Sequence, residues 1–199
     1  ARADATAAAD LPLTAPRCGD PTSGHEIAAG PVAGGGAGHG VRLVRATEAD
    51  AARLYAWRME PSTMAASRED RPIDFYDHLR WLARVLADPG RRLFILWHGA
   101  QRIGSARVDH TADGIELSLT LAPTARGAGL AVSVIEALVA EAATVQCVPR
   151  QYLATVRQGN HASLRAFWDA GFRAWWGDVL AGDGSGLVTL RRAADPAED

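Results

Sequence analysis

A short glycine-containing segment is the part of this sequence best suited to chemistry. Residues 126–131 read Arg-Gly-Ala-Gly-Leu-Ala, and they follow an apolar run that ends at Leu121. The residues after them predict a long helix, so the segment lies at a strand-to-helix turn. Free amides at a helix start, approached closely past residues with little or no side chain, bind an anion such as a diphosphate. Tight packing of a helix against a strand also favours two nearby glycines, and the segment alone leaves both interpretations open.

The run just before this segment supplies a candidate acid–base group. From Ile115 to Leu121 the odd-numbered residues are apolar, whereas Glu116, Ser118 and Thr120 share the other face of the predicted strand. A sheet that is covered on both sides is expected to carry a polar face only beside a cavity. Glu116 is therefore our candidate general base, acting directly or through a water. A solvated glutamate on an exposed strand face is the alternative.

A second segment makes the functional prediction from the first more specific. Residues 156–172 read Val-Arg-Gln-Gly-Asn-His-Ala-Ser-Leu-Arg-Ala-Phe-Trp-Asp-Ala-Gly-Phe. Together the two segments resemble the GNAT superfamily of N-acetyltransferases. The first matches its Arg/Gln-x-x-Gly-x-Gly/Ala coenzyme A loop and the second its Asn-x-x-Ser/Ala…Gly-Phe segment, and the resemblance covers roughly residues 41–180. It implies transfer of an acetyl group from acetyl-CoA, the co-substrate, to a primary amine.

The resemblance also implies which residues hold the coenzyme. They are Arg126, Gly127, Ala128, Gly129, Leu130 and Ala131 for the pyrophosphate, Leu119, Thr120 and Leu121 for pantetheine, and Asn160, Ser163 and Phe167 for further contacts. A plain helix cap is an equally good interpretation of Asn160. Many family members carry a tyrosine where this chain has Phe167, which cannot donate a proton. We assign no general acid, because a thiol with a pKa near ~8.5 is a tolerable leaving anion.

Three residues are candidates for the acceptor side, namely Arg58, His78 and Arg107. Their surroundings resemble the GNAT branch that acetylates nucleotide-linked aminosugars, as in pseudaminic-acid-type pathways, although Met59 stands where that branch normally has asparagine. Arginine and tryptophan near a cleft bind a nucleotide by charge and stacking.

Other interpretations of the acceptor side stay open. The neighbouring Trp57 and Trp81 are better explained as core residues, and a surface ion pair is the alternative for Arg58. A protein N-terminus is the second acceptor class, since ribosomal-protein acetyltransferases share the Trp57-Arg58 and His78-x-x-Trp81 patterns. A regulatory or scaffold module that binds coenzyme A without catalysis is the alternative from another class.

The elements that position these residues follow from the hydrophobic pattern. Strands are expected at 41–45, 93–97, 102–109, 115–121 and 152–156, with a closing hairpin of 172–180 and 187–190. Helices are expected from a cap at Thr47 to about Arg58, from a cap at Asp74 to Pro89-Gly90, over 129–143, and from a cap at Asn160 to Gly171. We therefore expect an α/β fold with a GNAT-like mixed, mostly antiparallel central sheet of about seven strands, flanked by about four helices.

The composition limits the remaining predictions, which concern domain boundaries, partners and location. Residues 1–40 are rich in Ala, Gly and Pro and predict a flexible tail or linker, 41–192 the acetyltransferase domain, and 193–199 an acidic C-terminal tail. With 21 Lys+Arg against 23 Asp+Glu there is no global basic field for nucleic acid. No apolar run predicts a membrane span, and Cys18 and Cys147 have no metal-site or disulfide spacing. We expect a cytoplasmic, metal-free enzyme, monomer or homodimer, that acts on a small-molecule amine.

Overall fold

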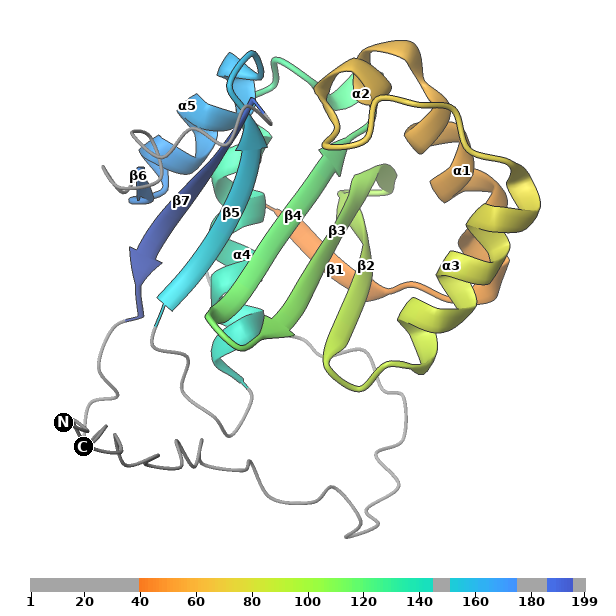
Figure 1. Cartoon of the computed structure of the whole chain (residues 1–199), viewed down its shortest axis with the longest axis horizontal. Coiled ribbons are helices and arrows are strands. Elements are labelled where there is room, and N and C mark those ends of the chain that lie inside the picture. Colours follow the sequence, from red (N-terminus) through yellow and green to blue (C-terminus); the bar gives the residue numbers. More distant parts are fainter. Residues whose placement is uncertain (1–39, 145–150, 175–185, 195–199) are drawn as a thin grey trace, which may run out of the picture. The chain divides into compact units, whose positions relative to one another are not determined.

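The computed structural model describes residues 40–144, 151–174 and 186–194. Its described part contains one seven-stranded sheet in the order β1-β2-β3-β4-β5-β7-β6 (Figure 1). The strands are β1 (Val41–Arg45), β2 (Arg91–His98), β3 (Gln101–Thr111), β4 (Gly114–Leu121), β5 (Gln151–Arg157), β6 (Arg173–Ala174) and β7 (Leu187–Ala193). Adjacent strands run antiparallel except β4 and β5, which are parallel. The mixed, mostly antiparallel sheet expected from the sequence is confirmed.

The α-helices are α1 (Ala51–Met59), α2 (Pro61–Ala66), α3 (Phe75–Ala87), α4 (Leu130–Ala143) and α5 (His161–Asp169). The short polar residues predicted as caps lie where expected. Thr47 opens a 3-10 turn, Glu48–Asp50, that leads into α1, and the Asp50 carboxylate accepts a hydrogen bond from the Thr47 amide at 3.0 Å. The Asp74 carboxylate accepts one from the Tyr76 amide at 2.7 Å and begins α3.

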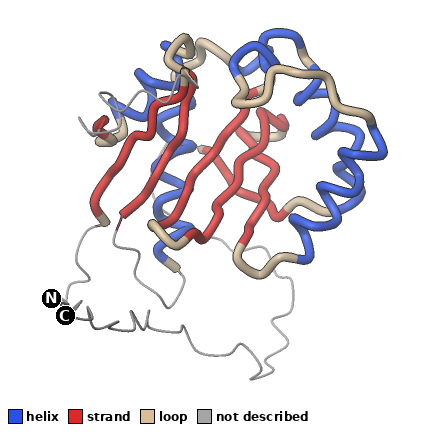
Figure 2. Tube along the Cα trace, viewed as in Figure 1, coloured by secondary structure: helices blue, strands red, loops and turns tan. Residues whose placement is uncertain are grey.

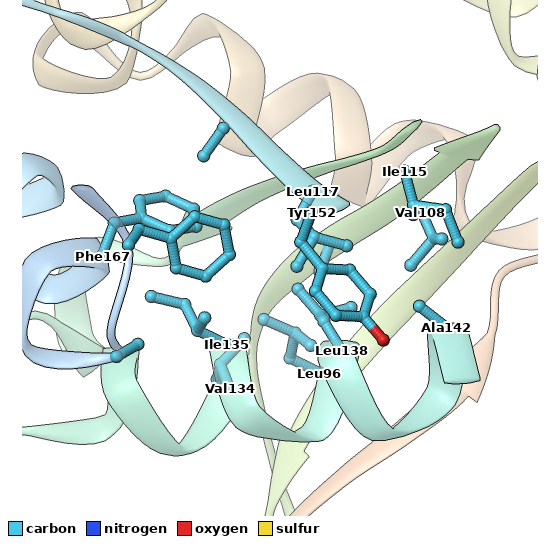
Figure 3. Close-up of a cluster of buried hydrophobic side chains, with 14 of the residues drawn as sticks. Leu96, Val108, Ile115, Leu117, Val134, Ile135, Leu138, Ala142, Tyr152 and Phe167 are labelled. Atoms are coloured by element: carbon cyan, nitrogen blue, oxygen red, sulfur yellow. The ribbon is translucent and has the colours of Figure 1, made fainter. Parts of the chain in front are cut away.

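Two hydrophobic clusters lie on opposite faces of the sheet. Alternate β2 residues separate them, because Phe94 and Leu96 belong to the larger cluster and Leu93 and Ile95 to the smaller one. The larger cluster packs α4 and α5 against the strands, and Figure 3 shows side chains of α4 directed at Leu117 and Tyr152. The smaller cluster packs α1 and α3 against β2. Figure 2 shows α1, α2 and α3 gathered beside the sheet, away from α4 and α5.

One element was not expected from the sequence. The six-residue α2 begins with Pro61 after Glu60, whose carboxylate accepts hydrogen bonds from the amides of Ser62 at 3.2 Å and Thr63 at 2.8 Å. An acidic residue followed by proline at the first helical position was the available signal. The helix is too short to show a hydrophobic periodicity, so the sequence pattern did not predict it.

Some expectations fall outside the described residues. They concern Cys18, Cys147, the tail before residue 40, the end of the predicted hairpin strand beyond Ala174 and most of the acidic tail. Among the described residues, no helix is long and apolar enough to cross a membrane. The same residues contain no group of three or more His, Cys, Asp or Glu side chains placed to hold a metal ion.

Candidate functional site

A cleft of about 1050 Å³ opens between α1, α2 and α3 on one side and α5 and the start of α4 on the other. Its floor is the polar face of the central strands, with Ser105 and Arg107 from β3, Ser118 and Thr120 from β4, and Thr155 from β5. The smaller hydrophobic cluster covers this face only around β2. The alternation noted in the sequence therefore marks a face that borders a cavity, as expected.

The parallel pair β4 and β5 is joined over a short stretch only. Partners are Ile115 with Tyr152 and Glu116 with Leu153. Figure 1 shows the two strands diverging from there towards α2 and α5. Leu117 to Leu121 and Thr155 to Arg157 line the cleft beyond this point. Unpaired strand backbone thus faces the cleft from both sides, and an extended amide-containing chain such as pantetheine would satisfy it.

The glycine-containing segment forms the turn from β4 into α4. Gly127 and Gly129 have left-handed backbone angles, with φ of 75° and 73°, and a Cβ at either position would meet no atom within 4 Å. In the described part of the chain no hydrogen bond is formed by the amides of residues 127–129, and the first amides of α4 have no partner within the helix. Arg126, Gly127 and Ala131 line the cleft. The turn therefore fits a diphosphate, with Ala128, Gly129 and Leu130 completing its backbone.

The Arg126 side chain, in contrast, is already occupied by protein partners. Its Nε donates to the Leu121 carbonyl at 3.0 Å, Nη2 to Glu60 Oε2 at 3.1 Å and to Thr63 Oγ1 at 2.6 Å, and Nη1 to the Ser62 hydroxyl. Four of its five side-chain N–H groups are used in this way, and its backbone amide donates to the Pro123 carbonyl at 3.3 Å.

The second predicted coenzyme segment borders the same cleft. Asn160 caps α5 by accepting a hydrogen bond from the Ser163 amide at 3.1 Å, so the helix-cap interpretation is confirmed. Asn160, Ser163 and Phe167 all line the cleft. Phe167 is buried and packs edge-to-face on Phe172 with ring centroids 5.1 Å apart. The structure thus brings both predicted coenzyme segments to one cavity.

Glu116 is held in a group of four charged residues on the polar face. Its carboxylate pairs with Arg68, and Asp109 lies opposite it on β3. Asp109 in turn pairs with Arg107 at 2.7 Å. Burial and the nearby positive charge of Arg107 lower the pKa of Arg68. Glu116 does not itself line the cleft, whereas Ser118, the next residue on its face, does. A water above Ser118 would connect Glu116 to the cavity.

His78 is buried beside the cleft, whereas Arg58 is half-buried. His78 is only 2% exposed, its Nε2 lies 3.1 Å from the Ala51 carbonyl oxygen, and burial lowers its pKa. Its ring stacks on Trp81 with centroids 5.3 Å apart. Arg58 Nη2 donates to the carbonyls of Glu69 at 2.6 Å and Arg71 at 3.4 Å. Both residues line the cleft, but their hydrogen bonds hold neighbouring backbone.

Trp57 and Trp81 have features of both a core residue and a cleft residue. Trp57 and Trp81 pack against the smaller hydrophobic cluster and also line the cleft. His78 on one side and the Arg107 guanidinium, 5.9 Å from the ring centroid, both contact Trp81. The preference for a packing role over nucleobase stacking is consistent with this arrangement.

Sequence reasoning missed four arginines of the cleft. Arg84 and Arg91 bond to residues close to them in the sequence, whereas Arg68 and Arg157 bond to distant segments. Arg157 ends β5, and its guanidinium pairs with Asp70 at 3.1 Å and donates to the carbonyls of Ser67 and Arg68. The partners of Arg68 and Arg157 lie 48 to 90 positions away, so no local pattern indicated them. The one available signal was the position of Arg157 at the strand end before the Asn160 segment.

Comparisons with known proteins agree with this geometry. A family model described as an acetyltransferase (GNAT) domain matches residues 41–173. No curated protein sequence matches the chain. An acetyltransferase from Thermus thermophilus is 25% identical, with a TM-score of 0.63 over 77% of this chain and 96% of the other.

Two more solved structures share the fold at lower identity. Spermidine N-acetyltransferase from Vibrio cholerae, in complex with CoA and spermine, is 15% identical, with a TM-score of 0.65 over 78% of this chain and 96% of the other. The aminoglycoside acetyltransferase AAC(6')-Ib, in complex with coenzyme A, is 20% identical, with a TM-score of 0.64 over 77% and 94%. The expected GNAT-like fold is confirmed.

Proposed function

We propose, from the premise that this chain belongs to the GNAT acetyltransferase family, that its acceptor is the primary amine of an anionic small molecule, with a nucleotide-linked aminosugar as the best candidate. The chain is accordingly an acyltransferase that uses acetyl-coenzyme A to acetylate an amine. The observation that supports the acceptor class is the charge of the cleft, whose lining includes seven arginines but only the carboxylates of Glu69 and Asp77.

Most of these arginines are neutralised by nearby carboxylates. The remaining arginines decide the sign of the net charge in the cleft. Arg68, Arg91, Arg107, Arg126 and Arg157 each pair with an Asp or Glu. Arg58 and Arg84 donate to backbone carbonyls instead, and neither pairs with a carboxylate in the described part of the chain. The charge left over on the acceptor side is positive.

A polycationic acceptor would need the opposite arrangement. The spermidine and aminoglycoside enzymes that share the fold act on such polycations by their names. Here Asp77 pairs with Arg80, and Glu60, Asp70, Asp109 and Glu116 are taken by cleft arginines. An acceptor with a phosphate or carboxylate group matches this cleft better than a polyamine does.

The roles of the chain's residues in acetyl transfer follow from their positions. The amides after Arg126 bind the pyrophosphate, and the separated edges of β4 and β5 bind pantetheine over Leu119, Thr120 and Leu121. Acetyl-CoA supplies the acetyl group, and coenzyme A leaves as the thiolate. The backbone amides of that stretch of β4 polarise the thioester oxygen.

The proton of the acceptor amine must then reach Glu116. Glu116 lies four residues before Thr120, about 13 Å along an extended strand. It therefore takes the amine proton through waters above Ser118 and not by direct contact with the reacting carbon. Phe167 has no proton to give, so the departing thiolate takes one from water.

A substrate screen on Glu116→Gln tests this proposal. Thiol release is measured for the unmutated protein and the variant with UDP-aminosugars, spermidine and N-terminal peptides. We expect turnover with the aminosugars and a loss of about 10²-fold or more in Glu116→Gln. Glu136→Gln is the matched control, because Glu136 also pairs with an arginine, Arg192, at 2.8 Å but lies on α4 outside the cleft.

Other results would replace the proposal. Turnover with peptides alone would indicate a protein N-terminal acetyltransferase. An unmutated protein that binds acetyl-CoA but transfers acetyl to none of the amines would indicate a non-catalytic coenzyme A-binding module. Equal activity in Glu116→Gln and Glu136→Gln would remove Glu116 from the mechanism.

A further inference from the structure

Residues 60–70, which we call the acceptor wall, form part of the side of the cleft that would face the acceptor. The acceptor wall comprises the cap Glu60, helix α2 and the four residues that follow. Ser62, Thr63, Ala66, Ser67, Arg68 and Glu69 line the cleft. The shape of this side therefore depends on what holds the acceptor wall in place.

One end of the wall is fixed by Arg126. Its guanidinium reaches Glu60, Ser62 and Thr63 at the first turn of α2, while its Nε is fixed to the Leu121 carbonyl at 3.0 Å. Four of the five N–H groups of an arginine are used in this way. Turning this side chain towards a phosphate would break all these bonds, and the amides of Gly127 to Ala131 already provide an anion site beside it.

Glu60 joins the two sides of this contact. The same carboxylate accepts hydrogen bonds from the Ser62 and Thr63 amides and from both their hydroxyls, and it also pairs with Arg126. These hydrogen bonds, that of the Ser62 hydroxyl first, lower the pKa of Glu60 to about 2. Glu60 therefore stays ionised near neutral pH.

The other end of the wall is fixed by the second coenzyme segment. Arg157 pairs with Asp70 and donates to the carbonyls of Ser67 and Arg68, and Asn160 Nδ2 donates to the Ala66 carbonyl at 3.5 Å. Arg126, Arg157 and Asn160 all come from segments that line the proposed coenzyme half. The acceptor wall is thus attached to the coenzyme half at both ends.

We propose that Arg126 is a positioning residue for the acceptor wall and not a ligand of the pyrophosphate. This inference rests on the proposed function, in which the amides that follow Arg126 bind the diphosphate. Once a diphosphate orders those amides, the backbone at Arg126 is held, and through Glu60 so is the first turn of α2. Coenzyme binding thereby orders the acceptor side before the amine arrives, which couples the two sites.

Substitutions in this contact should therefore affect the KM for the acceptor and the dissociation constant of coenzyme A differently. Replacing Arg126 by glutamine, or Glu60 by glutamine, should raise the KM for the acceptor about 10-fold and leave the dissociation constant of coenzyme A within about twofold. The effects of the two substitutions should be less than additive in the double variant, because both break the Arg126–Glu60 contact. Asp169→Asn is the matched control, since Asp169 pairs with Arg165 at the same 3.1 Å on the exposed face of α5.

Amide hydrogen exchange gives a readout that does not depend on turnover. Coenzyme A should slow exchange across residues 60–70 in the unmutated protein and in Asp169→Asn, and this protection should be lost in Arg126→Gln and Glu60→Gln. A protein that acetylates no amine yet shows the protection would overturn the proposed function and keep this inference. If Arg126→Gln weakens coenzyme A binding 10-fold or more while the protection persists, the inference is wrong and Arg126 is a phosphate ligand.

Discussion

Replacing the two loop glycines by alanine gives a measurable energy for the diphosphate turn. Gly127 and Gly129 sit in the left-handed region, and an added Cβ at either position meets no atom within 4 Å. The cost of the change is therefore conformational and amounts to about 1–2 kcal/mol for each residue. Gly99 is the matched control, because it has φ of 57°, equally open space, and a place in the β2–β3 turn outside the cleft.

The same cost should appear in different measurements at the two sites. In Gly99→Ala the strain can appear only as lost stability, with the melting temperature falling by about 2–4 °C for each kcal/mol. In Gly127→Ala and Gly129→Ala the unliganded loop can instead relax to a right-handed conformation, and coenzyme binding must then restore the turn. A cost of 1–2 kcal/mol appears as about 5- to 30-fold weaker binding. The sum of the stability and binding losses should be similar in all three variants.

Thermal unfolding and calorimetric titration with coenzyme A measure the two parts separately. We expect Gly99→Ala to bind coenzyme A like the unmutated protein. The reasoning would be refuted if Gly127→Ala and Gly129→Ala also bound it like Gly99→Ala while losing less than about 1 kcal/mol of stability. That outcome would mean that the left-handed turn has no part in the anion site.

Two further predictions concern buried positions. Burial lowers the pKa of His78, so the unfolded chain takes up its proton more readily, and stability should fall as pH drops below the unperturbed value near ~6.5. Urea unfolding between pH 7.5 and 5.5 should show a shallower pH dependence in His78→Gln than in the unmutated protein; parallel curves would contradict the assignment. A Cβ on Gly104 would lie 2.1 Å from the Thr120 carbonyl oxygen, so Gly104→Ala should cost about 1–3 kcal/mol or more and weaken coenzyme A binding, whereas Gly159→Ala, in open space, should do neither.

The parts of the fold that were predictable are those specified by residues close together in the sequence. Asp74 and Asn160 precede their helices directly, and the alternation from Ile115 to Leu121 assigned β4 and its polar face. The Arg126 to Ala131 turn was recognisable because its glycines are adjacent to the strand and helix that they connect. Each of these signals spans fewer than a dozen residues and is decided by local backbone preference.

The acceptor side could not be predicted in this way because its contacts join distant segments. Arg126 and Glu60 are 66 positions apart, and Arg68 and Glu116 are 48 apart. Charged residues with no periodic pattern give no indication of their partners. Arg58, a candidate for acceptor binding with a surface ion pair as the alternative, is bonded to the carbonyls of Glu69 and Arg71. The contacts of the Arg126 side chain with α2 also had no signal in the sequence, because α2 itself was not expected.

The two halves of the cleft therefore differ in what a substitution changes. The coenzyme half is made largely of backbone amides and unpaired strand edges, so most side-chain changes there leave its hydrogen-bonding groups intact. The acceptor half depends on arginine–carboxylate pairs such as Arg107 with Asp109 and Arg126 with Glu60, in which loss of one partner removes the counter-charge of the other. Such a cleft can change its acceptor by single substitutions in residues 60–70 while keeping its donor. Selectivity for the acceptor should therefore be altered most by substitutions in that wall.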